Sequence, residues 1–365
     1  MATPPIENLA LNTKDVADKA AIEEPQNPAE ERTTLFPKIG KFTDFLYQVK
    51  QLQPPVEHLH LIGSVKLHGT HADIVFVNNS DEIRLQSRNR LALTPEKDNA
   101  GFAAFIAATE KKTLLDLRDR ILEIYHSHNR KKDVIGDIVI AGEWCGAGIQ
   151  KKVAINEIPK FFAIISININ DTWQPECGYR DISNESASIF NVSKIGIYSL
   201  QMRMSNITAA EELIKDWTDE VEEECPFAKT LSVSGPGEGI VWRLSDYCGD
   251  PKFWFKSKGD LFTVSNSSKL PASAVDKDNR ERVENFANAI VTENRLEQGW
   301  EYLDQKNATG TGAFLKWLSN DCFIEEKREI EALDISKIKL GPAITVIAKP
   351  WFWARIEQAG REVKQ

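Results

Sequence analysis

Short apolar runs bounded by turn residues fill the chain from about residue 36 to residue 265, and they constrain its fold more than any other feature. The runs lie at 59–66, 72–77, 83–88, 137–145, 161–169, 239–244 and 252–258. Runs of this length with turn residues on both sides are typical of β-strands. Between these runs, apolar residues recur at helical spacing around residues 102–125 and 213–221, which predicts helices there. Many strands with few helices between them predict an α+β fold with antiparallel sheets, rather than a doubly wound parallel sheet.

Beyond about residue 270 the pattern changes to helical spacing. Residues 282–304 and 312–333 are predicted helices, and residues 343–348 are predicted as a short apolar strand or helix. A chain of 365 residues is long enough for about two domains. We therefore expect a first domain at 34–268 and a smaller, mainly helical domain at 269–365.

The remaining composition excludes several classes of protein. Residues 1–33 are rich in Pro, Glu, Ala and Asn, which predicts a mobile tail, and they lack the basic start and apolar stretch of a secretory signal. No apolar run approaches the ~18 residues of a membrane helix, so we expect no membrane association. Five cysteines without a CxxC pair favour free thiols in a reducing compartment, the cytoplasm or nucleus. A net charge of −9 argues against a surface covered with basic residues that bind nucleic acid, but it is compatible with a local basic groove.

Charged and aromatic residues stand at or near the ends of the predicted strands, where a sheet-lined cleft presents side chains to a ligand. In order, they are Lys66-Leu67-His68-Gly69-Thr70, Ser87-Arg88, Gly142-Glu143, Phe161-Phe162, Glu238-Gly239-Ile240-Val241 and Phe255-Lys256-Ser257-Lys258. Taken singly, each has an ordinary explanation as a solvated lysine, a surface carboxylate or a core aromatic ring. The signal is the ordered set.

The ordered set resembles the covalent nucleotidyltransferases, which are the polynucleotide ligases and messenger-RNA capping enzymes, and within them the RNA ligase 2-like group. Lys66 to Thr70 matches motif I, in the His-Gly-Thr form that RNA ligases favour. Gly142-Glu143 matches motif III, Phe161-Phe162 motif IIIa, Glu238 to Val241 motif IV and Phe255 to Lys258 motif V. The resemblance covers about residues 36–265, and it implies that the first domain is a nucleotidyltransferase (adenylation) domain.

The resemblance implies an ATP-dependent RNA ligase. In such an enzyme Lys66 attacks the α-phosphate of ATP, releases pyrophosphate and carries AMP as a phosphoramidate. The AMP passes to a 5′-phosphate end, and an RNA 3′-hydroxyl displaces it to seal the strand. The implied cofactors are ATP and Mg²⁺ or Mn²⁺, the implied partner is RNA with 5′-phosphate and 3′-hydroxyl ends, and we expect a monomer.

The charged motif residues have roles that suit this chemistry. Glu238 is expected to bind the divalent ion through its hard oxygen ligands, and Glu143 to bind ribose hydroxyls. Lys256 and Lys258 are two residues apart, so a strand directs both to the same face, where they can hold the α-phosphate. An attacking lysine must be neutral, although its reference pKa is ~10.4. We expect burial and the two neighbouring lysines to lower the pKa of Lys66.

The other motif residues are expected around the nucleotide and the substrate end. His68 and Gly69 are expected to bind the nucleotide. His71 and Arg88 are expected to bind the substrate end, and Arg88 alternatively the nucleotide phosphates. One ring of Phe161-Phe162 is expected to stack on the purine, because strand alternation lets only one of them face the cleft.

The chain departs from the family pattern, and other functions stay open. His71 stands where motif I of the RNA ligase 2-like group has Asn, Val65 stands where a Glu precedes the lysine, and Ser166 stands where motif IIIa has Asp. No motif VI or OB-fold pattern follows, which counts against two alternatives, a DNA ligase and a GTP-dependent capping enzyme. Further alternatives are a non-catalytic module that binds nucleic-acid ends, and transfer of AMP to a protein.

Overall fold

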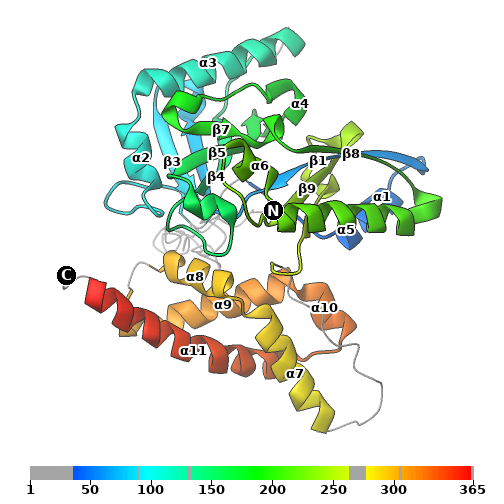
Figure 1. Ribbon diagram of the computed structural model, residues 1–365, viewed down its shortest axis with the longest axis vertical. Coiled ribbons are helices and arrows are strands. Elements are labelled where there is room, and N and C mark those ends of the chain that lie inside the picture. Colours follow the sequence, from blue (N-terminus) through cyan, green and yellow to red (C-terminus); the bar gives the residue numbers. More distant parts are fainter. Residues whose placement is uncertain (1–35, 89, 130–132, 263–276, 304–305, 363–365) are drawn as a thin grey trace, which may run out of the picture.

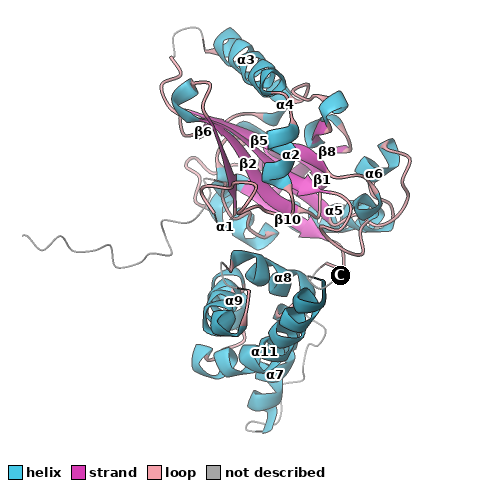
Figure 2. Ribbon diagram, turned by 90° about the vertical axis from the view of Figure 1, so that its left-hand side faces the viewer, coloured by secondary structure: helices cyan, strands magenta, loops and turns pink. Residues whose placement is uncertain are grey.

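The computed structural model describes residues 36–88, 90–129, 133–262, 277–303 and 306–362, so the tail predicted at the N-terminus lies outside the described residues. The strands form two sheets, which lie above a group of helices from the C-terminal part of the chain (Figure 2). The first sheet has the order β10 (Trp254–Lys258), β9 (Gly239–Leu244), β1 (His58–Lys66) and β8 (Ile197–Arg203). The second has the order β3 (Ile83–Ser87), β2 (Thr70–Phe76), β4 (Ile138–Cys145), β5 (Phe161–Ile169) and β6 (Thr172–Trp173), with β7 (Ile189–Asn191) beside β5.

The strand pairs are antiparallel except for β7, which runs parallel to β5. The predicted α+β class with antiparallel sheets is therefore confirmed. Each strand predicted from the sequence is present with its ends shifted by at most two residues. Sequence reasoning missed β8, in which Leu200 and Met202 are the buried residues of an otherwise largely exposed edge strand.

Helices cover the two sheets (Figure 1). The buried side chains form two hydrophobic cores, and the first includes Phe161 and Ala163 of the second sheet. The helices on the first sheet are α1 (Phe42–Lys50), α5 (Ile207–Glu223) and α6 (Pro226–Thr230). Those on the second are α2 (Phe102–Ala108), α3 (Lys111–His128) and α4 (Glu176–Tyr179). Helix α3 shows why these helices pack on the sheets. Its buried residues recur every three or four positions and form one apolar face; they are Leu114, Leu117, Ile121 and Tyr125.

The C-terminal helices form a third core of their own, and we call them the helical unit. They are α7 (Lys277–Ile290), α8 (Glu293–Tyr302), α9 (Thr311–Glu325), α10 (Lys327–Ala332) and α11 (Lys337–Glu362). Trp300, Phe314 and Phe352 are buried in this core. The boundary predicted at residue 268 lies outside the described residues. No helix in the described part of the chain is both long and apolar enough to span a membrane.

Three predictions for the helical unit need correction. The segment 282–304 holds two helices, because the Thr292 hydroxyl accepts a hydrogen bond from the Arg295 N–H and begins a new helix there. The segment 312–333 likewise divides into α9 and α10. The apolar run 343–348 is neither a strand nor a short helix but the middle of α11.

Replacing Phe45 by alanine is expected to destabilise the first core. The Phe45 side chain is fully buried, and its ring centroid lies 4.9 Å from that of Phe255. Phe45→Ala should lower the free energy of unfolding by about 3–5 kcal/mol, measured by urea denaturation. Tyr47→Ala on the same helix is the control, because Tyr47 is 53% exposed and its loss should change stability by about 0.5 kcal/mol at most. Equal losses in the two variants would contradict this packing.

Candidate active site

The candidate site lies where the chain passes from one sheet to the other. Lys66 is the last residue of β1 and Thr70 the first of β2, so Leu67, His68 and Gly69 form the connection. The register of the first sheet pairs Lys66 with Gly239, and Gly239 with Lys258 on the next strand. Since Glu238 immediately precedes Gly239, three neighbouring strands bring two lysines and a carboxylate to the same level.

Two ammonium groups and an imidazole converge on the buried carboxylate of Glu238, which is 1% exposed. Lys66 Nζ lies 2.7 Å from Glu238 Oε2, and Lys258 Nζ lies 2.7 Å from Glu238 Oε1. His68 Nδ1 lies 3.1 Å from Glu238 Oε2 and donates the hydrogen, because a carboxylate only accepts. His68 Nε2 has no hydrogen-bond partner among the described residues, so it is available to a ligand in the site.

The pKa values of this cluster differ from the sequence prediction. Burial alone would lower the pKa of Lys66, but the carboxylates of Glu238 and Glu143 outweigh burial and raise it, so the prediction of a lowered pKa is wrong for this arrangement. Burial favours neutral Glu238, yet Lys258 and Lys66 outweigh it and hold the pKa of Glu238 well below its usual range. The pKa of Lys256 is lowered, to about 8, because of its burial and the ammonium groups near it. Lys66 is thus held as an ammonium ion.

Two glycines allow the backbone to approach closely enough to build the cluster. Gly239 has a φ of +150°, and a Cβ at this position would lie 2.1 Å from the carbonyl oxygen of Ser257. A Cβ on Gly69 would lie 2.3 Å from the carbonyl oxygen of Trp144. Gly69 N–H also donates to Glu143 Oε1 at 3.0 Å, which fixes this carboxylate beside the connection. A side chain at either glycine would push the strands apart.

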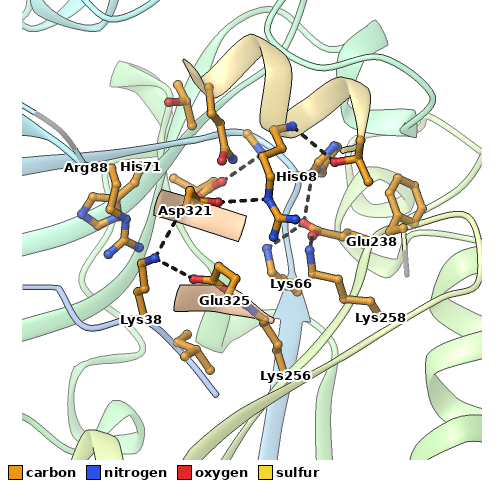
Figure 3. Close-up of a pocket in the computed structure, with 18 of the residues that line it drawn as sticks. Lys38, Lys66, His68, His71, Arg88, Glu238, Lys256, Lys258, Asp321 and Glu325 are labelled. Carbon is orange, nitrogen blue, oxygen red and sulfur yellow. Dashed lines mark hydrogen bonds and ion pairs between the residues drawn. The ribbon is translucent and has the colours of Figure 1, made fainter. Parts of the chain in front are cut away.

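A cavity of about 1530 Å³ opens beside the cluster, with walls from both sheets and from the helical unit. Pockets for small molecules are typically roughly 300–1,000 Å³, so this cavity has room for a nucleotide and a strand end. Figure 3 shows the charged side chains that surround it. The predicted site residues that line it are Lys66, His68, Gly69, His71, Arg88, Glu143, Glu238, Lys256 and Lys258.

Phe161 and Phe162 are absent from the described lining of the cavity, so the prediction that one of them stacks on the base needs correction. Phe161 is buried in the first core, where its ring stacks on Phe227 with centroids 5.2 Å apart. Phe162 is buried in the second core, and a Cβ on Gly142 would lie 2.3 Å from its ring. The two rings do point to opposite faces of β5, but other elements cover both faces there. The β5 residue that lines the cavity is Ile165.

Arg88 and His71 share another wall of the cavity, next to Phe36 (Figure 3). Arg88 Nη1 donates to the carbonyl oxygen of Phe36 at 2.7 Å. The imidazole of His71 stacks on the ring of Phe36 with centroids 5.0 Å apart, and its Nε2 lies 2.9 Å from Asp73 Oδ1. The two residues predicted for the substrate end are therefore brought together, on the side of the cavity away from Glu238.

Sequence reasoning missed the wall that comes from the helical unit. Asp321 and Glu325 of α9 face Lys38, which precedes α1, and Glu325 also faces Lys256. The available signal was a pair of carboxylates four residues apart on a predicted helix. That spacing is ordinary on a solvated helix face, so only the packing of the two parts of the chain reveals what these side chains face.

Comparisons with known proteins give one family match and a set of similar solved structures. A family model described as RNA ligase matches residues 59–258, which is 200 of the 365 residues. Among solved structures the chain is similar to variants of a Naegleria gruberi RNA ligase. One with AMP and Mn aligns at 17% identity and a TM-score of 0.39, over 63% of this chain and 57% of that chain. One with ATP and Mn aligns at 17% identity and a TM-score of 0.39, over 63% and 62%. The chain thus spans less than two thirds of these structures. A comparison with curated proteins finds no match.

Glu238→Gln is expected to lower the pKa of Lys66, because it removes a favourable charge and leaves the burial. Only the neutral amine reacts with acylating reagents, so acylation should rise with pH in both proteins and do so at lower pH in the variant. At about pH 8, each unit by which the pKa falls makes Lys66 react about tenfold faster. Peptide mass spectrometry after a short pulse of acetic anhydride measures this rate. The exposed Lys50 is the internal control, and unchanged or slower acylation of Lys66 would contradict the ion pair.

Proposed function

The chain belongs to the RNA ligase family, and on that premise we propose that it is an ATP-dependent RNA ligase of the RNA ligase 2-like group. In this proposal it joins 5′-phosphate and 3′-hydroxyl ends of RNA through a covalent lysyl-AMP on Lys66. The observation that carries the proposal is the pairing of Lys66 with Glu238 at the cavity, in register with Lys258. An amine fixed beside a second ammonium group fits attack on a bound phosphate, because the second cation attracts the phosphate oxygens.

In the first step, Lys66 Nζ forms a bond to the α-phosphorus of ATP. The bond from that phosphorus to the oxygen that bridges to the β-phosphate breaks, and pyrophosphate leaves with the electron pair. Lys66 releases one proton to solvent before it attacks, since an ammonium ion has no free electron pair, and a second as the bond to phosphorus forms. Lys256 and Lys258, which line the same cavity, offset the negative charge on the phosphate oxygens.

In the later steps, an oxygen of the RNA 5′-phosphate attacks the α-phosphorus, and the bond to Lys66 Nζ breaks. The oxygen of an RNA 3′-hydroxyl then attacks the phosphorus of the activated 5′-phosphate and gives its proton to solvent. The bond from that phosphorus to the oxygen that bridges to AMP breaks, and AMP leaves with the electron pair. His71 and Arg88 fit the binding of the 5′-phosphate end, because both line the wall opposite Glu238.

A divalent ion fits this site through a shared set of ligands. The described residues contain no group of three or more His, Cys, Asp or Glu side chains that could hold a metal ion. Mg²⁺ in nucleotide-binding sites typically takes one or two carboxylates together with substrate phosphates and water. Glu238 is the carboxylate that would hold it. When bound, the ion would neutralise Glu238 and withdraw charge from the phosphate, which favours a neutral Lys66.

Lys66→Ala is expected to abolish covalent labelling by ATP, because the variant has no amine at the position of attack. The measurement incubates each protein with ATP labelled at the α-phosphate and follows label bound covalently to the denatured chain. Labelling should fall by about a hundredfold or more in the variant. The control is Lys50→Ala, an exposed lysine on α1, which should be labelled like the wild type. Labelling of Lys66→Ala at wild-type intensity would contradict the assignment.

The same assay separates the alternative functions. Covalent label from GTP rather than ATP would identify a capping-type enzyme. A wild-type chain that binds RNA ends but takes no label from either nucleotide would be a binding module. AMP that moves from Lys66 to a protein rather than to RNA would identify a protein as the acceptor.

RNA strands with a 5′-phosphate and a 3′-hydroxyl are expected to be joined, whereas strands with a 5′-hydroxyl should not be. The 5′-phosphate supplies the oxygen that takes AMP from Lys66, so its removal blocks the second step but leaves lysyl-AMP formation intact. Denaturing gel electrophoresis of labelled RNA measures the joined product. DNA strands with the same ends are the matched comparison, and faster joining of DNA than of RNA would indicate a DNA ligase.

A further inference from the structure

Two carboxylates of α9 reach across the cavity to lysines of the sheet-containing part of the chain. Glu325 Oε1 lies 3.0 Å from Lys38 Nζ, and Glu325 Oε2 lies 3.7 Å from Lys256 Nζ. Asp321, one helical turn earlier, places Oδ1 3.3 Å from Lys38 Nζ. Figure 3 shows Lys38 with contacts to both carboxylates. Helix α9 of the helical unit and the segment before α1 therefore meet through charge at the candidate site.

Ion pairs hold both carboxylates in position, and Glu325 is a permanent charge. Burial opposes the ionisation of Glu325, but Lys256 and Lys38 outweigh it and lower the pKa of Glu325 to about 2. Glu325 is therefore anionic throughout the physiological pH range. Asp321 is held from its own side, because Arg295 Nε of α8 lies 2.9 Å from Asp321 Oδ2. Helix α9 thus presents an ordered anionic group to the cavity.

Lys38 and Lys256 carry ammonium groups, which are suited to binding phosphate. Ammonium groups form strong, charge-assisted hydrogen bonds with phosphate oxygens as well as with carboxylates. Lys256 stands in the motif whose lysines are expected to hold the nucleotide phosphate, yet its partner here is a carboxylate from the helical unit. Lys38 binds the other oxygen of that same carboxylate. A phosphate group between these two lysines would make the same contacts, and it cannot do so while Glu325 is there.

We propose that Lys38 and Lys256 form a subsite for phosphate groups, and that Glu325, assisted by Asp321, is an internal anion that competes for it. The inference rests on the proposed function and deepens it, because it identifies how ligand binding at the same site is regulated. Without phosphate, the carboxylates hold the helical unit closed over the cavity. A polyphosphate or an RNA strand displaces them and releases the helical unit.

The size of the effect follows from the other contacts between the two parts of the chain. Lys41 also binds the helical unit, through Glu326 at 3.1 Å and through Glu329. Closure therefore weakens when Glu325 loses its charge, but it is not abolished. When a ligand binds only the open state, its apparent association constant is the intrinsic constant multiplied by the fraction of molecules that are open. Removing one partly buried carboxylate should raise that affinity by about three- to tenfold.

Isothermal titration calorimetry of the full chain with inorganic pyrophosphate tests the subsite. Glu325→Gln should bind pyrophosphate about three- to tenfold more tightly than the wild type. The matched control is Glu331→Gln on α10, because Glu331 is 63% exposed and pairs with Lys327 on its own helix at 4.0 Å. That control removes the same charge from the same unit and should bind like the wild type. Adding Lys38→Gln to Glu325→Gln should cancel the gain.

A parallel titration identifies the source of the phosphate. RNA with a 5′-phosphate and the same RNA with a 5′-hydroxyl are titrated into each variant. A gain for pyrophosphate assigns the subsite to the nucleotide, and a gain that requires the 5′-phosphate assigns it to the RNA end; both support the proposal. No gain of Glu325→Gln for either ligand, or an equal gain in Glu331→Gln, overturns it. Because nothing turns over in these titrations, failure of the proposed function leaves their result intact.

Discussion

The buried carboxylate of Glu238 is the constraint from which the arrangement of the site follows. A charge at 1% exposure is very costly unless every oxygen has a partner. Lys66, Lys258 and His68 supply those partners, and they can do so only because β1, β9 and β10 are in register and Gly239 allows close approach. The contacts that make the burial possible are also the ones that hold Lys66 protonated. The ion pairs that stabilise the buried carboxylate therefore oppose deprotonation of Lys66, and a bound ligand must weaken them before the amine can attack.

The strands could be predicted from the sequence where a run of apolar side chains is almost continuously buried. The run 161–169 becomes β5 with unchanged ends, because nearly all of its side chains are buried between covering elements. The edge strand β8 could not be seen, since alternate side chains of Ile197–Arg203 face solvent and leave little apolar signal. The break before α8 depends on one hydroxyl, that of Thr292, which a count of apolar residues ignores.

The site could be predicted where a residue's position along a strand decides its surroundings. Lys66, Glu238 and Lys258 are brought together because each stands at the same end of adjacent strands. The base-stacking prediction failed because both faces of β5 are covered at Phe161-Phe162, which one strand's sequence does not show. The pKa of Lys66 was predicted in the wrong direction because the nearest charge is a carboxylate from a distant segment. The contact of Glu325 with Lys38 depends on how two separately packed parts of the chain meet, and a local sequence pattern carries no information about that packing.

The connection from β1 to β2 joins Lys66, the proposed nucleophile at the end of β1, to a strand that packs in another hydrophobic core. Val65 and Leu67, the neighbours of Lys66, are buried in the first core, and Ala72, five residues after Leu67, is buried in the second. Local opening of either core, of the kind that hydrogen exchange detects, displaces the amine even when the other core is intact. Substitutions deep in either core therefore act as active-site substitutions in any assay of turnover. On warming, turnover should be lost at a lower temperature than the one at which the whole chain unfolds.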